Sequence, residues 1–157
     1  LGELAERYER ALLGLAGGLL NGSSVLAGDA VQETWLRVIR FADRKSVGEI
    51  SREIAALAAR AKSGQLGPAE MSGSTFTVTN SGAFGSLLFT PIINHPEAAI
   101  IGMGRVEETP VARDGQVVVR KVMYLCLSYD HRIVDGGPAV QFLNAVKVRL
   151  EACDVSE

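Results

Sequence analysis

The chain is poor in the residue types that metal and disulfide sites require. Only two of its 157 residues are cysteine and two are histidine, and no Cys-x-x-Cys or Cys/His spacing suits a metal ion. Cys126 falls in a strand-like run and Cys153 near the C-terminus. We therefore expect two thiols in a reducing compartment, which predicts a cytoplasmic protein with no metal.

Long blocks of one charge and long apolar runs are also scarce. The formal net charge is −2, and no run of Lys or Arg is long enough to form a basic stripe, which argues against a nucleic-acid partner. The apolar N-terminus is interrupted by charges such as Glu6 and Arg10, so neither a signal peptide nor a membrane span of ~20 residues is expected. With 47% hydrophobic residues, the composition is that of one globular domain.

Apolar spacing predicts helices in the first part of the chain. Apolar residues three and four positions apart mark an amphipathic helix over roughly residues 1–20. Two further helices begin with capping-box patterns, one after Asp29 that ends near Phe41 and one after Ser46 that ends at Gly64. The chain is therefore expected to be helical as far as Gly64.

The spacing of apolar residues changes after Pro68, where strand patterns begin. Residues 74–80 alternate at period two, and two long strands are predicted over residues 98–112 and 116–130. Asp114 and Gly115 stand between these strands and supply the positive φ of a type I′ hairpin turn. A last helix is predicted to begin at Gly136–Pro138, so helices and strands together predict an α+β fold.

The stretch LSYDHRIVDGGP, residues 127–138, holds the side chains best suited to chemistry. His131 follows a predicted strand directly, and histidine is the side chain whose unperturbed pKa lies near neutral pH, so a proton-transfer site is one interpretation. Asp135 stands just before the last predicted helix, where a capping carboxylate is equally favoured. From the residues alone, a catalytic pair and a structural turn both stay open.

The same stretch resembles the histidine motif of the dihydrolipoyl acyltransferases, the core subunits of 2-oxo acid dehydrogenase complexes. The resemblance rests on SYDHRIVDG and continues upstream without a break to Ser74, through STFTVTNSGAFGSLLFTPIINHPEAAIIGMG. It reaches back more loosely through VIRFADRKSVGEISREIAALAARA, and covers about residues 38–152. It implies an acyltransferase catalytic domain over residues 43–157, built like the C-terminal half of a chloramphenicol-acetyltransferase-like two-layer sandwich of mixed sheet and helices. Residues 1–42 would form two extra helices, and DAVQETWLRV there resembles region 2 of an extracytoplasmic-function sigma factor.

The resemblance also assigns roles to three residues. The motif's histidine, here His131, would be the general base that takes the proton from the thiol of coenzyme A or dihydrolipoamide, because the thiolate is the better nucleophile. The Thr79 hydroxyl would donate a hydrogen bond to the tetrahedral oxyanion. From the residues alone, Thr79 could equally be a structural β-branched residue of the strand. Asp135 stands where the family has Asp or Asn and would orient the site.

Other residues keep structural interpretations. Asp130 and Arg132 are expected to fix the local turn beside the histidine. Gly82 and Gly85 predict a turn with positive φ or, as the alternative, a loop that lets the pantetheine arm of coenzyme A pass close to the backbone. His95 is expected to be structural.

The implied function is acyl transfer between dihydrolipoamide and coenzyme A within a 2-oxo acid dehydrogenase complex. Coenzyme A would be a substrate with no contacts assigned, and a lipoylated domain of another polypeptide would bring the lipoyl group, because no lipoyl module is recognisable here. The family's site lies between subunits of a trimer, so a homotrimer-based assembly and the dehydrogenase components are expected partners. Two alternatives remain: an inactive remnant or assembly module, and a transcription-associated protein. The motifs lean toward succinyl- or branched-chain-transferring members.

Overall fold

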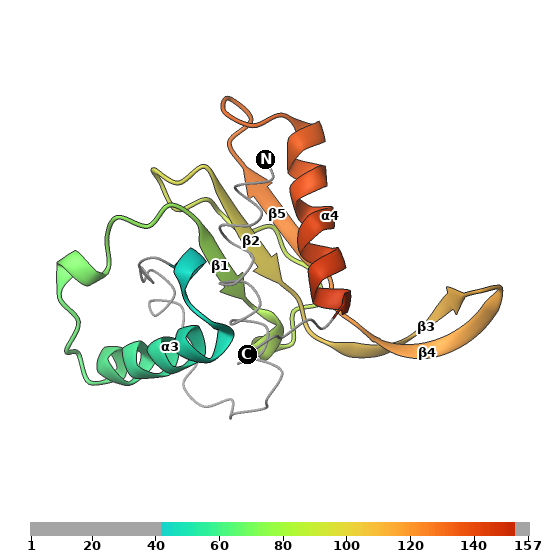
Figure 1. The fold of residues 1–157 in the computed structure, drawn as a ribbon, viewed down its shortest axis with the longest axis horizontal. Coiled ribbons are helices and arrows are strands. Elements are labelled where there is room, and N and C mark those ends of the chain that lie inside the picture. Colours follow the sequence, from blue (N-terminus) through green and yellow to red (C-terminus); the bar gives the residue numbers. More distant parts are fainter. Residues whose placement is uncertain (1–41, 153–157) are drawn as a thin grey trace. The chain divides into compact units, whose positions relative to one another are not determined.

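The computed structural model describes residues 42–152, so the helices expected within residues 1–41 and the sigma-like segment lie outside the described residues. Helices and strands both occur in this part, as the α+β prediction requires (Figure 1). The elements in chain order are η1 (Ala42–Arg44), α3 (Val47–Lys62), η2 (Pro68–Glu70), β1 (Thr77–Asn80), η3 (Gly82–Phe84), β2 (Ala99–Met103), β3 (Glu107–Arg113), β4 (Gln116–Val122), β5 (Leu125–Tyr129) and α4 (Gly136–Ala152).

The described chain divides into two compact units. One unit is Phe76–Asp130, which holds all five strands, and the other combines the segments on either side of it, which hold α3 and α4.

Helix α3 begins and ends as its sequence predicts. The Ser46 hydroxyl accepts a hydrogen bond from the Glu49 N–H at 3.3 Å, and the Glu49 carboxylate accepts one from the Ser46 N–H at 2.7 Å, which completes the capping box. This backbone hydrogen bond lowers the pKa of the Glu49 carboxyl. After the helix, Gly64 takes a positive φ of 69°. The expected helix from Ser46 to Gly64 is therefore confirmed.

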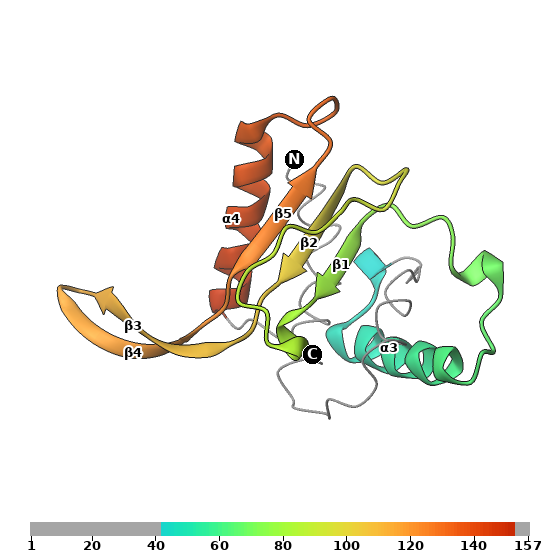
Figure 2. The ribbon, with the colours of Figure 1, turned by 180° about the vertical axis from the view of Figure 1, so that it is seen from behind.

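A mixed three-stranded sheet forms the centre of the unit Phe76–Asp130. Its strand order is β1-β2-β5, with β1 parallel to β2 and β2 antiparallel to β5. Figures 1 and 2 show β2 between the other two strands from opposite sides. The register pairs Thr79 with Gly102 and Gly102 with Cys126.

The two long strands predicted over residues 98–112 and 116–130 are each broken in two. The breaks fall after Met103 and after Val122, so that β3 and β4 form a separate two-stranded ribbon. At the break the Gly104 N–H donates to the Tyr124 carbonyl at 2.9 Å. A Cβ at Gly104 would lie 2.1 Å from the Leu87 carbonyl oxygen, so this close backbone packing takes the place of a regular ladder.

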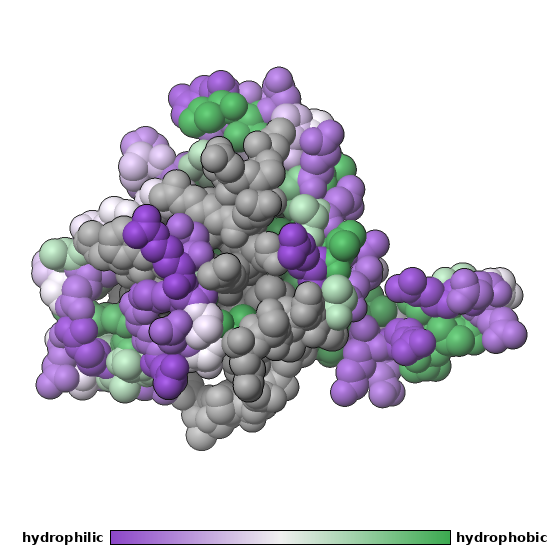
Figure 3. All heavy atoms as spheres, viewed as in Figure 1, coloured by the Kyte–Doolittle hydropathy of each residue, from purple (hydrophilic) through white to green (hydrophobic). Residues whose placement is uncertain are grey.

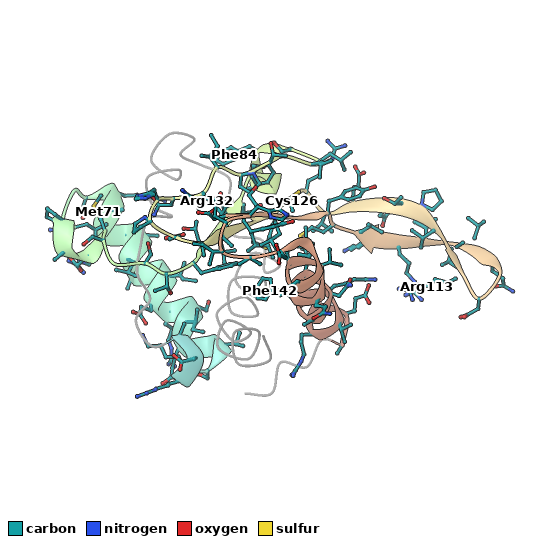
Figure 4. All side chains as sticks on the ribbon, turned by 90° about the horizontal axis from the view of Figure 1, so that it is seen from above. Met71, Phe84, Arg113, Cys126, Arg132 and Phe142 are labelled. Carbon is teal, nitrogen blue, oxygen red and sulfur yellow. The ribbon has the colours of Figure 1, made fainter. Side chains whose placement is uncertain are left out.

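The ribbon ends in the turn that its sequence predicts. Asp114 and Gly115 have φ values of 50° and 75°, which are those of a type I′ turn. Arg113, labelled in Figure 4, lies far out on the ribbon. Val117 and Val119 are 77% and 65% exposed, and Figure 3 shows hydrophobic and hydrophilic residues together over the ribbon.

The two faces of the three-stranded sheet differ in polarity. Successive side chains of a strand point to opposite faces, so each strand contributes alternate residues to each face. Paired residues on neighbouring strands share a face. One face, which we name the threonine face, carries Thr77, Thr79, Ile100, Gly102, Cys126 and Ser128. The opposite face is more apolar and carries Val78, Ile101, Met103, Leu125, Leu127 and Tyr129.

A glycine after β1 is required by close backbone packing. A Cβ at Gly82 would lie 2.3 Å from the carbonyl carbon and oxygen of Gly104. We expect Gly82→Ala to lower the free energy of unfolding by about 3 kcal/mol, at the upper end of the usual overpacking cost, because backbone atoms must move. Urea denaturation followed by circular dichroism measures this change.

The matched control is Gly48→Ala near the start of α3, where an added Cβ meets nothing within 4 Å. This change should leave stability equal or raise it by about 0.5–1 kcal/mol, because alanine is the better helix former. Equal urea midpoints for Gly82→Ala and the unmodified chain would show that the segment after β1 accommodates an added Cβ without loss of stability.

Candidate active site

His131 and Asp135 lie on the turn between β5 and α4. Strand β5 ends at Tyr129, and the Asp130 N–H donates to the Ala98 carbonyl at 2.8 Å, which fixes the strand end. The turn then runs until α4 begins at Gly136. His131 is therefore placed at the end of a hydrogen-bonded strand, as the sequence predicts.

The side chains of His131 and Asp135 approach each other. Asp135 Oδ1 lies 3.7 Å from His131 Nδ1. The His131 side chain is 69% exposed and the Asp135 side chain is 85% exposed. At this separation the two atoms are too far apart for a hydrogen bond, and the contact is an ion pair only when the imidazole is protonated. A carboxylate beside Nδ1 favours the tautomer with its proton on that nitrogen, and the lone pair of the neutral ring is then at Nε2.

Thr79 belongs to the other unit, on the threonine face of β1. It is half-buried and pairs with Gly102. A Cβ at Gly102 would lie 2.7 Å from Cζ of Phe89, so the Phe89 ring occupies the space over that glycine. Since neighbouring strands lie about 4.8 Å apart, the ring borders the side of the sheet on which Thr79 stands.

The loop after β1 fits the predicted turn in part. Gly85 has a φ of 90°, as a turn glycine should, and ends η3. Gly82 is not among the residues with positive φ, so the expectation is wrong for that position. Glycine is needed there instead because it has no Cβ, which allows the Gly104 backbone to approach closely.

Glu97, which no sequence pattern singled out, is only 6% exposed. Its carboxylate accepts hydrogen bonds from the Thr77 hydroxyl at 2.5 Å and from the Asn94 side-chain amide at 3.1 Å. A carboxylate is seldom buried without such donors. The available signal was an acid next to the apolar run AAII, residues 98–101, which leads into the buried strand β2.

Neither a metal-binding cluster nor a membrane-spanning helix occurs within residues 42–152. No group of three or more His, Cys, Asp or Glu side chains within residues 42–152 could hold a metal ion. No helix in that range is both long and apolar enough to cross a lipid bilayer.

Comparisons with known sequences point to one family. The model described as "2-oxoacid dehydrogenases acyltransferase (catalytic domain)" matches residues 35–156. The acetyltransferase component of the pyruvate dehydrogenase complex of Bacillus subtilis is 49% identical over 122 residues, which are 78% of this chain and 28% of that protein. The succinyltransferase component of the 2-oxoglutarate dehydrogenase complex of Haemophilus influenzae is 50% identical over 114 residues, 73% of this chain and 28% of that protein. The chain thus spans 28% of the length of both relatives.

Solved structures that resemble this chain come from the same family. A probable dihydrolipoamide acetyltransferase from Listeria monocytogenes matches with a TM-score of 0.76 and 36% identity, over 96% of this chain and 71% of that one. The cubic core of a pyruvate dehydrogenase multienzyme complex matches with a TM-score of 0.70 and 39% identity, over 76% and 48%. A structure of the Azotobacter vinelandii dihydrolipoamide acetyltransferase has a TM-score of 0.68 and 39% identity over the same shares, and was studied for one serine, one histidine and one asparagine in the catalytic mechanism.

Proposed function

Because the chain belongs to the family of 2-oxoacid dehydrogenase acyltransferases, through their catalytic domain, we propose that it moves an acyl group between dihydrolipoamide and coenzyme A. The observation that carries the proposal is the exposed His131 imidazole, with Asp135 Oδ1 3.7 Å from Nδ1. This pair lies inside residues 35–156, the part of the chain that the family model matches.

The proposed reaction needs a base and an oxyanion donor. His131 Nε2 takes the proton of the coenzyme A thiol, and the sulfur forms a bond to the thioester carbonyl carbon of the acylated dihydrolipoamide. The carbonyl oxygen becomes an oxyanion, to which the Thr79 hydroxyl donates a hydrogen bond. The oxyanion then re-forms the carbonyl, the old carbon–sulfur bond breaks, and the released dihydrolipoamide thiolate takes the proton back from His131. Asp135 holds the ring in the required tautomer.

The spacing of three residues supports these roles. In the A. vinelandii enzyme the histidine follows the serine by as many positions as His131 follows Thr79, and its asparagine follows the histidine as Asp135 follows His131. Threonine for serine keeps the hydroxyl donor. Aspartate for asparagine keeps a side-chain oxygen on the Nδ1 side of the ring, a group able to accept from Nδ1–H at closer approach.

The proposal includes an assembly in which copies of the chain share the site. One relative forms the cubic core of its complex, which supports a homo-oligomer built from trimers. His131 of one copy would then act with Thr79 of the next, and another polypeptide would carry the lipoyl group. We also propose that the sheet and helices adopt the chloramphenicol-acetyltransferase-like two-layer arrangement, and that dehydrogenase components of the complex are partners.

A turnover assay tests the proposed function. We expect coenzyme A-dependent transfer of an acyl group from S-acyl-dihydrolipoamide, measured by the amount of acyl-coenzyme A formed, with acetyl, succinyl and branched-chain donors compared in parallel. The relatives include both acetyl- and succinyltransferases, so the ratio of rates identifies the acyl class. A chain that assembles as trimers by light scattering and turns over none of the three donors would be an assembly module rather than an enzyme.

A further inference from the structure

The buried Glu97 connects three segments of the unit Phe76–Asp130. Each carboxylate oxygen accepts one hydrogen bond, Oε2 from the Thr77 hydroxyl of β1 at 2.5 Å and Oε1 from the Asn94 side chain at 3.1 Å. The Glu97 N–H donates to the Asn94 carbonyl at 2.8 Å. The next residue, Ala98, accepts from the N–H of Asp130 at the end of β5. The segment thus ties the start of β1 to the end of β5.

The bond to Thr77 bears directly on Thr79. The two threonines are separated by one residue of β1 and therefore project from the same face of the strand. Strand β1 has only four residues and pairs with β2 alone in the sheet. A charge-assisted hydrogen bond at its first residue fixes the rotation of the short strand about its own axis, and this rotation sets the direction of the Thr79 hydroxyl.

We propose that Glu97 is a positioning residue, which acts through Thr77 to hold the hydroxyl of Thr79 in its donating direction. The inference rests on the proposed function for the role of Thr79, and on the hydrogen bonds above for the positioning. An oxyanion donor is effective only in a narrow range of positions, so a small rotation of β1 lowers turnover while leaving the bound substrates in place. Glu97 itself touches no reacting atom in this scheme.

Two substitutions remove the connection in different ways. Thr77→Val deletes the hydroxyl and keeps the shape of a β-branched strand residue, whereas Glu97→Ala removes the acceptor. Glu97→Gln is the conservative variant, because its amide keeps one acceptor oxygen and can donate to the Thr77 oxygen. Glu108→Ala is the matched control, since Glu108 is an exposed acid on the β3–β4 ribbon.

Hydrogen exchange measures the positioning without any need for turnover. In the full chain we expect peptides that cover residues 76–81 to exchange at least about fivefold faster in Thr77→Val and Glu97→Ala, since the anchor that opposes local opening is lost. Glu97→Gln should return most of the protection, and Glu108→Ala should match the unmodified chain. Unchanged exchange in Thr77→Val would overturn the proposal even if Glu97→Ala failed to fold.

Kinetics then separates positioning from a general structural role. We expect Thr77→Val to lower kcat about tenfold with little change in KM, and to lower it no further when Thr79 is already alanine, because the two changes act on one hydroxyl. An equal tenfold loss in the presence and absence of the Thr79 hydroxyl would overturn the proposal. An unmodified chain without turnover refutes the proposed function instead, while the exchange data still decide whether Glu97 holds β1.

Discussion

Replacement of His131 by alanine is expected to lower kcat/KM for acyl transfer by about a hundred- to ten-thousand-fold, the range that a positioned general base contributes. The exposed ring at the end of β5 is the group proposed to take the thiol proton, and alanine leaves the thiol to ionise by itself. Initial rates at several coenzyme A concentrations give kcat and KM separately. KM should change little, because the base acts in the transition state.

The pH dependence of this loss provides a second check. A free thiol has a pKa of about 8.5, so raising the pH supplies thiolate without a base. The ratio of the unmodified rate to the His131→Ala rate should therefore shrink between neutral pH and pH values above that of the thiol. His95→Ala changes the chain's other histidine, which is exposed, and should leave the rate within about twofold of the unmodified chain. Equal rates for His131→Ala and the unmodified chain at neutral pH exclude this residue as the base.

Local sequence patterns predicted those features that local interactions determine. The capping box of Ser46 and Glu49 begins α3 where the sequence places it, because both hydrogen bonds join residues three positions apart. The Asp114–Gly115 turn forms because both residues tolerate positive φ. The approach of Asp135 to His131 follows in the same way from their i, i+4 spacing on one turn.

Features that depend on distant segments were not predictable in this way. The long strands are broken at Gly104 because the backbone of Leu87 approaches it closely, and no period within the strand sequence reports that approach. Glu97 is buried because Thr77, twenty residues away in the sequence, donates to it. The position of Glu97 beside an apolar run is visible in the sequence, but its partner is apparent only from the pairing of β1 with β2.

Thr79→Val should lower kcat by about a hundred- to a thousand-fold, which is the usual effect of removing one oxyanion donor. Valine keeps the β-branched shape on β1, so the strand and its pairing with Gly102 should persist. Thr79→Ser keeps the hydroxyl and should retain most of the rate. Loss of turnover in Thr79→Ser equal to that in Thr79→Val would assign the residue a packing role instead of a donor role.

Co-expression of the Thr79→Val chain with the His131→Ala chain tests whether copies share the site. Each chain alone should be nearly inactive. In the mixture, a shared site is intact where a Thr79→Val copy supplies His131 and the neighbouring His131→Ala copy supplies Thr79. Random mixing of equal amounts gives this arrangement at about one contact in four, so about a quarter of the unmodified rate should return. Co-expression of His131→Ala with the double variant, in which no such contact exists, should restore nothing. If the first mixture forms mixed oligomers by mass spectrometry and stays inactive, both groups must act within one copy, and the shared site is wrong even if each single variant behaves as expected.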